Sequence, residues 1–268
     1  MKRKLFFISI AAAALAVSLL ALPTTSANET KTKTVAKEVT FNKDIAPIFF
    51  KSCAECHRAG EIAPFSVMSF KDVRPWAKSI KEKVVGKQMP PWHADPNHGE
   101  WVNDRRLSQA QIDLISAWVD GGTKEGSAKD LPPAPKFVAG WNIGKPDELF
   151  SIPEQKVPAT GVIAYQYVKV PTNFKEDRWV TAAEIRSTGR EAMHHVIVFI
   201  QDPKNPSRTD GNLLAGFAPG EQPARVPDGF AKKVPAGATL YFQLHYTPNG
   251  KELTDVTTIG LKYLKEAP

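Results

Sequence analysis

Cysteine is scarce in this sequence: its 268 residues include two, Cys53 and Cys56. Both belong to one motif, so no disulfide is available to cross-link the rest of the chain. No second cysteine pair exists, which argues against a structural zinc site, because such a site usually takes four nitrogen or sulfur ligands. No cysteine follows the N-terminal apolar run either, which excludes a lipid anchor attached to cysteine at that point.

The sequence also lacks a run of basic residues and an internal repeat. The formal net charge is +7, of which Lys2, Arg3 and Lys4 supply three charges at the N-terminus. The other lysines are spread along the chain, so we interpret them as a solvated surface that helps to dock an acidic redox partner, and not as a nucleic-acid-binding surface. With 42% hydrophobic and 24% charged residues, the composition is that of a globular protein long enough for two modest domains.

The N-terminus reads as an export signal. Residues 1–27 begin with positive charge, continue with an apolar run from Leu5 to Leu22 and end in small residues at Ala27, after which we expect cleavage. An uncleaved membrane anchor is the alternative, because the apolar run is nearly long enough to span a bilayer. Residues 28–38 are rich in Lys and Thr and are predicted to be a disordered spacer. We therefore expect a bacterial protein that is periplasmic or secreted.

Cys53-Ala54-Glu55-Cys56-His57 is the attachment signature of a c-type haem. In such a site the two cysteines form thioethers with the porphyrin vinyl groups, and the histidine lies beside the iron as its proximal ligand. A redox dithiol and half of a zinc site are the alternatives for two cysteines at this spacing. The adjoining histidine and the export signal favour haem c, because haem c is attached outside the cytoplasm.

Helical periodicity surrounds this motif. Apolar residues recur at helical spacing from Phe41 to Phe50, and a second helix is expected over Ser69–Val85. Ser108, with Gln111 three residues later, is typical of a capping box that opens a third helix, and Gly121 ends that helix.

We expect Met89 to be the sixth ligand of the haem iron. Met89 is followed by Pro90 and Pro91, a rigid turn that holds a thioether with little loss of entropy, and methionine opposite histidine raises the reduction potential. Met68 and His93 are the alternatives. Met68 lies close to the attachment site, and His93 would give a bis-histidine haem of lower potential.

Beyond a proline-rich stretch the pattern changes to the alternation of β-strands. The predicted strands are Gly161–Val170, Arg178–Ile185, His194–Gln201, Ala238–Tyr246 and Thr257–Tyr263. For the fold class we therefore predict a multidomain chain: a small all-α c-type cytochrome over residues 39–128, a proline-rich linker over 129–142, and an all-β antiparallel, jelly-roll-like sandwich over 143–268.

Three histidines are the remaining candidate functional residues. His194 and His195 open one predicted strand, and His245 lies in another. An imidazole in an apolar strand is costly unless its nitrogens find partners or a metal, and three neutral imidazoles suit copper, and also zinc or iron. Neighbours on a regular strand point to opposite faces, so His194 and His195 share an ion only at a strand end or a bulge. Spacing alone leaves metal binding and a structural role open.

The order of these motifs resembles a known family. His194-His195-Val-Ile-Val-Phe, followed about fifty residues later by Leu-His245-Tyr246, is similar to the N-terminal domain of the copper type II, ascorbate-dependent monooxygenases, the peptidylglycine and dopamine β-monooxygenases. The haem-motif region, with its Met-Pro-Pro-Trp-His loop, resembles the cytochrome c domain fused ahead of such a module in some bacterial proteins. The resemblance implies that His194, His195 and His245 bind the copper that relays electrons.

The family also uses a second copper, where oxygen and substrate react, held by a His-x-His pair and a methionine from a following β domain. This sequence has no His-x-His pair, and its last methionine is Met193. The resemblance therefore implies an exported haem c and copper redox protein that relays electrons for O₂-dependent C–H hydroxylation of a small organic substrate. We expect the oxygen-activating copper to lie in residues beyond this sequence or in a partner protein.

Two other functions compete with this one. The chain is alternatively a plain electron-transfer cytochrome whose sandwich docks it to another protein, with three structural histidines. A metal-dependent hydrolase is disfavoured, because no acidic residue closely flanks the histidines as an evident general base.

Overall fold

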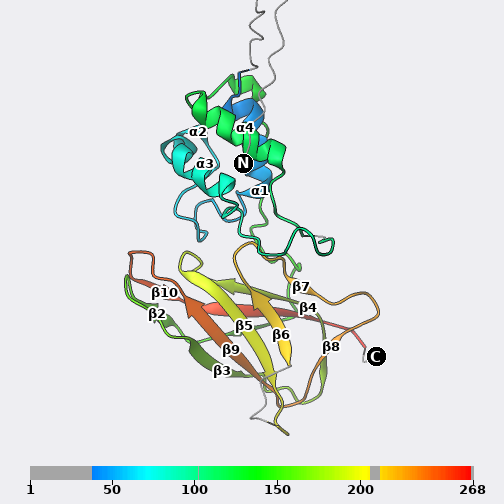
Figure 1. Cartoon of the computed structure of the whole chain (residues 1–268). Coiled ribbons are helices and arrows are strands. Elements are labelled where there is room, and N and C mark those ends of the chain that lie inside the picture. The colour runs from blue at the N-terminus through cyan, green and yellow to red at the C-terminus, as the bar shows by residue number, and fades with distance from the viewer. Residues whose placement is uncertain (1–37, 102, 206–211, 267–268) are drawn as a thin grey trace, which may run out of the picture. The chain divides into compact units, whose positions relative to one another are not determined.

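The computed structural model describes residues 38–101, 103–205 and 212–266 (Figure 1). The predicted signal and all of the predicted spacer except Glu38 lie outside the described residues. The helices are η1 Phe41–Ile45, α1 Ala46–Ser52, α2 Phe70–Val73, η2 Arg74–Trp76, α3 Ala77–Val85, α4 Gln109–Asp120 and η3 Ala128–Asp130, where η marks a short π- or 3₁₀-helix. The strands are β1 Glu148–Ser151, β2 Gln155–Val157, β3 Gln166–Pro171, β4 Arg178–Ser187, β5 Met193–Gln201, β6 Leu213–Phe217, β7 Ala224–Arg225, β8 Lys232–Val234, β9 Thr239–Tyr246, β10 Leu253–Asp255 and β11 Thr257–Tyr263.

Local sequence signals set the helix boundaries. The Ser108 hydroxyl accepts a hydrogen bond from the Gln111 N–H, and the Gln111 side chain accepts one from the Ser108 N–H, which is the predicted capping box. The predicted helix over Ser69–Val85 is instead two α-helices joined by a 3₁₀ turn at Pro75, because proline has no N–H to continue the α-helical bonding. No helix of the described residues has the length and hydropathy needed to cross a bilayer.

An aromatic cluster holds the helices together. The Phe41 ring lies 6.2 Å from the ring of Phe49, 5.7 Å from that of Phe70 and 6.0 Å from that of Trp118. The Lys124 carbonyl accepts hydrogen bonds from the Trp118 indole N–H and the Phe41 amide, both at 2.9 Å. These bonds join the start of η1 to the segment that follows α4, and each buried ring contributes about 1.5–3 kcal/mol.

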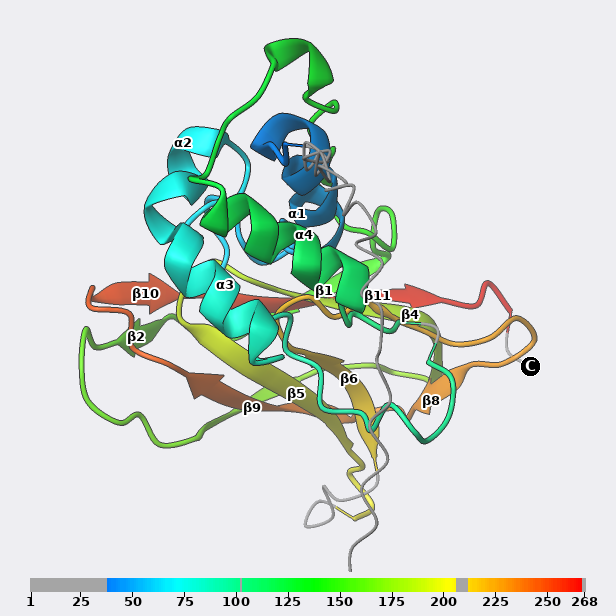
Figure 2. The ribbon, with the colours of Figure 1, turned by 45° about the horizontal axis from the view of Figure 1, so that its top comes forward.

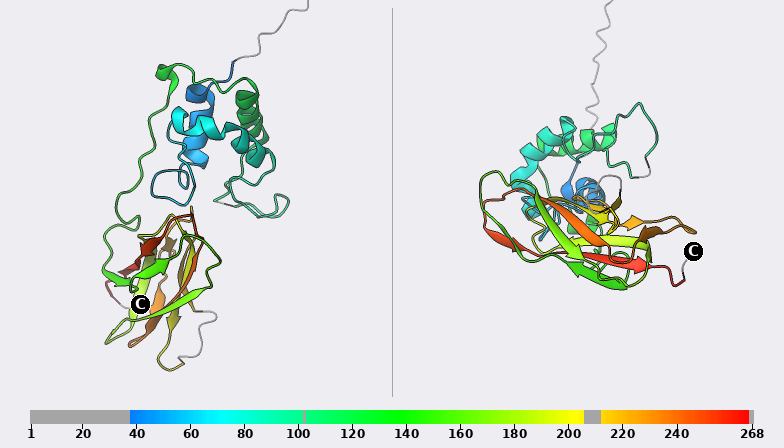
Figure 3. Two further views of the ribbon diagram at one scale, coloured as in Figure 1. Left: turned by 90° about the vertical axis from the view of Figure 1, so that its left-hand side faces the viewer. Right: turned by 90° about the horizontal axis from the view of Figure 1, so that it is seen from below.

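Antiparallel strands form two main sheets and one two-stranded ribbon. The order is β1-β11-β4-β7 in the first sheet, where β8 also pairs with β4, and β3-β9-β5-β6 in the second, while β2 pairs with β10 (Figures 1 and 2). The two main sheets share one hydrophobic core, to which the first contributes Ile259 and Leu261 and the second Val196, Leu240 and Phe242, all fully buried. They therefore pack face to face, as the views in Figure 3 show.

The predicted long strands are present, and the short ones were not predicted. The five predicted runs correspond to β3, β4, β5, β9 and β11, although β3 begins at Gln166 and not at Gly161. The other strands have two to five residues, as in β7 and β6, which is too short for an alternating pattern to stand out.

The predicted fold class is wrong. Of the described residues 27% lie in strands and 19% in short helices, so the chain is mainly β and is not an all-α cytochrome followed by a sandwich. Residues from Glu38 onward form one compact unit. The physical reason is that α-helices of 4 to 12 residues are marginal on their own. Loop side chains of the helical part also contact loops of the β-rich part: Glu61 pairs with Arg190, and Arg105 donates to the Pro219 carbonyl.

Candidate metal centre

The three histidines of the β-rich part meet on two paired strands. His195 of β5 lies directly opposite His245 of β9, and His194 is next to it. One ligand nitrogen of each ring lies within 4.8 Å of the other two, and the ring centroids are 5.0 to 5.3 Å apart. Across residues 38–101, 103–205 and 212–266, no other three His, Cys, Asp or Glu side chains are close enough together to hold a metal ion.

A β-bulge brings the two adjacent histidines together. Met193 pairs with Tyr246 and His195 pairs with His245, so β5 has one extra residue, His194, between two consecutive pairs. Met193 is fully buried while both histidine side chains reach toward His245. The bulge thus removes the geometric objection that neighbours on a regular strand point to opposite faces.

The ring nitrogens of this cluster fit a cation. Burial, with smaller effects of His245 and His194, lowers the pKa of His195, so its imidazole is neutral at pH 7 and has a lone pair to donate. The Nδ1 atom of His245 is buried without a hydrogen-bond partner. An unpaired buried nitrogen costs about 1–3 kcal/mol, and a metal ion bound there would satisfy it. Three imidazoles without a carboxylate suit copper, and also zinc.

An aromatic side chain covers one face of the cluster. The Tyr165 ring stacks on the ring of His245 with 4.6 Å between centroids and 23° between planes, and it lies 5.5 Å from the ring of His195. Tyr165 falls in a predicted strand, but nothing in the local pattern singles it out. Its place against His245 follows from the pairing of β3 with β9.

A buried carboxylate accepts hydrogen bonds from residues close to the histidines in sequence. Asp255 is fully buried and accepts hydrogen bonds from the hydroxyls of Ser187 (2.7 Å), Tyr246 (2.8 Å) and Thr257 (2.7 Å), and from the Gly189 N–H (2.9 Å). A Cβ on Gly189 would lie 2.9 Å from the Cβ of Asp255, so this position has no room for a larger residue.

Asp255 therefore connects the two histidine-bearing strands. Gly189 lies in the turn that leads into β5 and accepts the N–H of Met193, which precedes His194. Tyr246 follows His245 in β9. Asp255 was not predicted from the sequence, although a lone aspartate in a β-rich segment is a signal that could have identified it.

The predicted haem motif lies in a turn after α1. The amides of Cys56 and His57 both donate to the Cys53 carbonyl, at 3.2 and 2.9 Å, so one turn presents all three side chains. The Nδ1 atom of His57 lies 3.1 Å from the Phe65 carbonyl oxygen. A carbonyl only accepts, so Nδ1 carries the hydrogen and Nε2 keeps the lone pair that an iron would take. The histidine thus has the tautomer of a proximal ligand.

The electrostatics of the thiols differ from those of a redox dithiol. Burial, followed by the neighbouring Cys56, raises the pKa of Cys53 to about 12, and burial also raises the pKa of Cys56. Reactive dithiols work through thiolates of lowered pKa. The half-buried neutral thiols of Cys53 and Cys56 differ from these, which disfavours a redox dithiol.

The structure does not select the sixth haem ligand. Met89 lies in the loop after α3 with 41% of its surface exposed, whereas Met68 is half-buried against the helical core. His93 is exposed. Met89 as a ligand stays a prediction.

Neither the models of known protein families nor the curated proteins include a match to this chain. The resemblance to copper monooxygenases thus depends on the quoted motifs alone.

Proposed function

We propose that this protein is an exported redox protein that holds haem c and copper and relays electrons for a copper-dependent monooxygenase. The convergence of His194, His195 and His245 supports the copper site most directly, because a bulge and two strands bring together three side chains that a structural role would not require to meet. The haem site is supported by the turn and tautomer of the Cys53–His57 motif.

Each residue has a defined task in this proposal. Cys53 and Cys56 attach the porphyrin, and His57 offers Nε2 to its iron while the Phe65 carbonyl fixes the ring. When bound, haem and copper each supply a centre that takes up and releases one electron. The chain itself sets the distance between the centres and their surroundings. The oxygen-activating copper lies outside the residues of this sequence in this proposal, and hydroxylation takes place there.

Metal analysis of the haem-loaded protein tests the proposal. We expect one copper per chain in the wild type and none in His245→Ala, with an unchanged haem spectrum, because the copper ligands are remote in sequence from the haem motif. His98→Ala is the matched control, since His98 is an exposed histidine whose side chain is 82% accessible. It should retain full copper content.

The alternative functions make different predictions in the same assay. A plain electron-transfer cytochrome would contain haem and no copper, and His245→Ala would match the wild type. Zinc in place of copper in protein purified from its natural compartment would refute the redox role of the histidines, because zinc has no accessible second oxidation state.

A further inference from the structure

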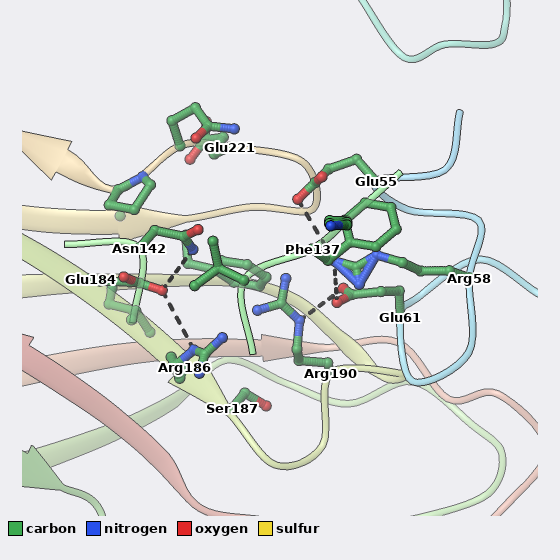
Figure 4. Close-up of a pocket in the computed structure, with 17 residues that line it drawn as sticks. Glu55, Arg58, Glu61, Phe137, Asn142, Glu184, Arg186, Ser187, Arg190 and Glu221 are labelled. Atoms are coloured by element: carbon green, nitrogen blue, oxygen red, sulfur yellow. Dashed lines mark hydrogen bonds and ion pairs between the residues drawn. The ribbon is translucent and has the colours of Figure 1, made fainter. Parts of the chain in front are cut away.

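A cavity of about 380 Å³ lies between the loop that follows the haem motif and the sheet that contains β4 (Figure 4). Arginine and glutamate supply seven of its 17 lining residues. The haem-motif side contributes Glu55, Arg58 and Glu61, and the strand side contributes Arg186 and Arg190. The Glu61–Arg190 ion pair between these two parts of the chain lies in this cavity wall.

Glu61 is the central group of this junction. One carboxylate oxygen of Glu61 lies 3.0 Å from the Arg58 guanidinium, and the other accepts the Nε–H of Arg190 at 2.8 Å. The three side chains are mostly buried, with 12% of Glu61, 20% of Arg58 and 24% of Arg190 exposed. The Arg58 guanidinium lies 3.9 Å from the centre of the Phe137 ring, and that of Arg190 lies 4.8 Å from the centre of the Phe217 ring. Figure 4 shows Arg58 and Arg190 converging on Glu61 from opposite sides.

Each arginine is close to one of the two proposed ligand sets. Arg58 follows His57 directly in the chain. The Arg190 carbonyl accepts the N–H of Met193 at 3.3 Å, and His194 is the next residue. A continuous path of covalent bonds, the Arg58–Glu61 ion pair and two hydrogen bonds therefore runs from His57 through Arg58, Glu61 and Arg190 to His194. Every contact in this path is made by residues of the chain, without a haem or a copper ion.

Arg105 makes a second contact between the two parts of the chain, because its guanidinium donates to the Pro219 carbonyl at 3.5 Å. Unlike the Glu61–Arg190 pair, this contact does not lead to a histidine of the metal cluster.

We propose that the Glu61–Arg190 ion pair is the electron-transfer junction of this protein: it fixes the haem-motif loop against the turn that leads into β5 and so sets the rate of electron exchange between the two centres. The proposal rests on the proposed function. Glu61 and Arg190 are positioning residues in it, because neither contacts the iron or the copper ligands with its side chain. Electron tunnelling falls steeply with separation, so loosening this contact lowers the rate without changing either centre.

The test compares Arg190→Gln with Arg186→Gln in the full chain loaded with haem and copper. Arg186 lines the same cavity but pairs with Glu184, on its own strand. After flash reduction of the haem, we expect Arg190→Gln to transfer the electron to copper more slowly by about tenfold or more, because removing one partner leaves Glu61 with a poorly compensated buried charge. Arg186→Gln should match the wild type, and Arg190→Lys should recover part of the rate.

Hydrogen exchange provides a readout that does not depend on electron transfer. The amides of Ala63 and Val67 donate to the carbonyls of Cys56 and His57, at 3.3 and 2.9 Å. Both should exchange faster in Arg190→Gln than in Arg186→Gln. If Arg190→Gln does not fold, Glu61→Gln makes the same comparison, since it keeps the shape of the side chain and removes its charge.

Three results would refute the proposed role of the Glu61–Arg190 ion pair in electron transfer. The first is an electron-transfer rate in Arg190→Gln and Glu61→Gln equal to that of Arg186→Gln. The second is unchanged exchange at both amides. The third is a slower rate explained entirely by a shifted midpoint potential of haem or copper, which would indicate an electrostatic and not a positional effect. A wild type without copper would instead refute the proposed function itself, and it is recognised before any variant is made.

Discussion

Asp255 gives the sharpest prediction about the metal centre. Its carboxylate accepts four hydrogen bonds of 2.7 to 2.9 Å, and these connect the turn before β5 to the residue after His245. In Asp255→Ala the hydroxyl donors can rotate toward other acceptors, and the Gly189 N–H keeps the Ser187 hydroxyl oxygen, 3.1 Å away, as its second acceptor. We expect the variant to lose about 1.5–3 kcal/mol of folding free energy, because its buried donors lose hydrogen bonds to a carboxylate.

Copper affinity should fall along with stability. Groups behind a metal ligand typically contribute about 10- to 100-fold to metal affinity, and Asp255 supports both strands that carry histidines. We therefore expect Cu(II) to bind Asp255→Ala about 10- to 100-fold more weakly, measured by competition with a chelator at a temperature where the variant is folded. The Cu(II) affinity of Asp255→Asn should lie between those of the wild type and Asp255→Ala. Its amide oxygen can still accept the Gly189 N–H, while its NH₂ donates to the Tyr246 hydroxyl.

Asp177→Ala is the control for this experiment. Asp177 also accepts a backbone N–H, that of Ala236, and pairs with Lys233, but it is exposed and contacts neither histidine strand. If Asp255→Ala binds copper as tightly as Asp177→Ala, the carboxylate does not position the ligands and the reasoning from the hydrogen bonds is refuted.

Three further predictions concern stability and the haem. Burial, followed by the charge of Glu148, raises the pKa of Tyr263, so above about pH 10 the unfolded chain releases a proton that the folded chain keeps, and stability should fall as the pH rises. Burial raises the pKa of Tyr246 as well, so Tyr263→Phe should make this fall shallower without removing it in urea titrations at high pH. Phe242→Ala should lose about 3–5 kcal/mol in urea unfolding, because the ring is fully buried between the sheets; a loss below 1 kcal/mol would contradict the shared core. Met89→Ala should keep the covalent haem and lower its midpoint potential; a drop in Met68→Ala instead would reassign the ligand.

The turn geometry of the Cys53–His57 motif and the main secondary structure could be predicted because their signals are local. Cys53, Cys56 and His57 lie within one turn, so their spacing in sequence nearly determines their spacing in space. The Ser108 cap and the alternation in β9 are likewise set by residues within a few positions of each other. Short-range geometry leaves few alternatives at such places.

The fold class could not be predicted, because it depends on contacts between remote segments. Helical periodicity around the haem motif correctly indicated helices, but it does not say whether they bury enough surface to form a domain of their own. The Glu61–Arg190 pair joins positions 129 residues apart, and no local pattern indicates such a contact. Domain boundaries drawn from composition remain predictions for the same reason.

Sequence alone determined which residue types are present and which strand each histidine belongs to. Tertiary structure decided whether the histidines meet: the bulge at His194 turns one side chain to the same side as its neighbour, and strand register places His245 opposite. Tyr165 and Asp255 joined the site only through the pairing of strands far apart in the chain. A one-residue change of register reverses the face of every side chain on a strand, so a site of this kind is set by the pairing of strands and not by the order of residues.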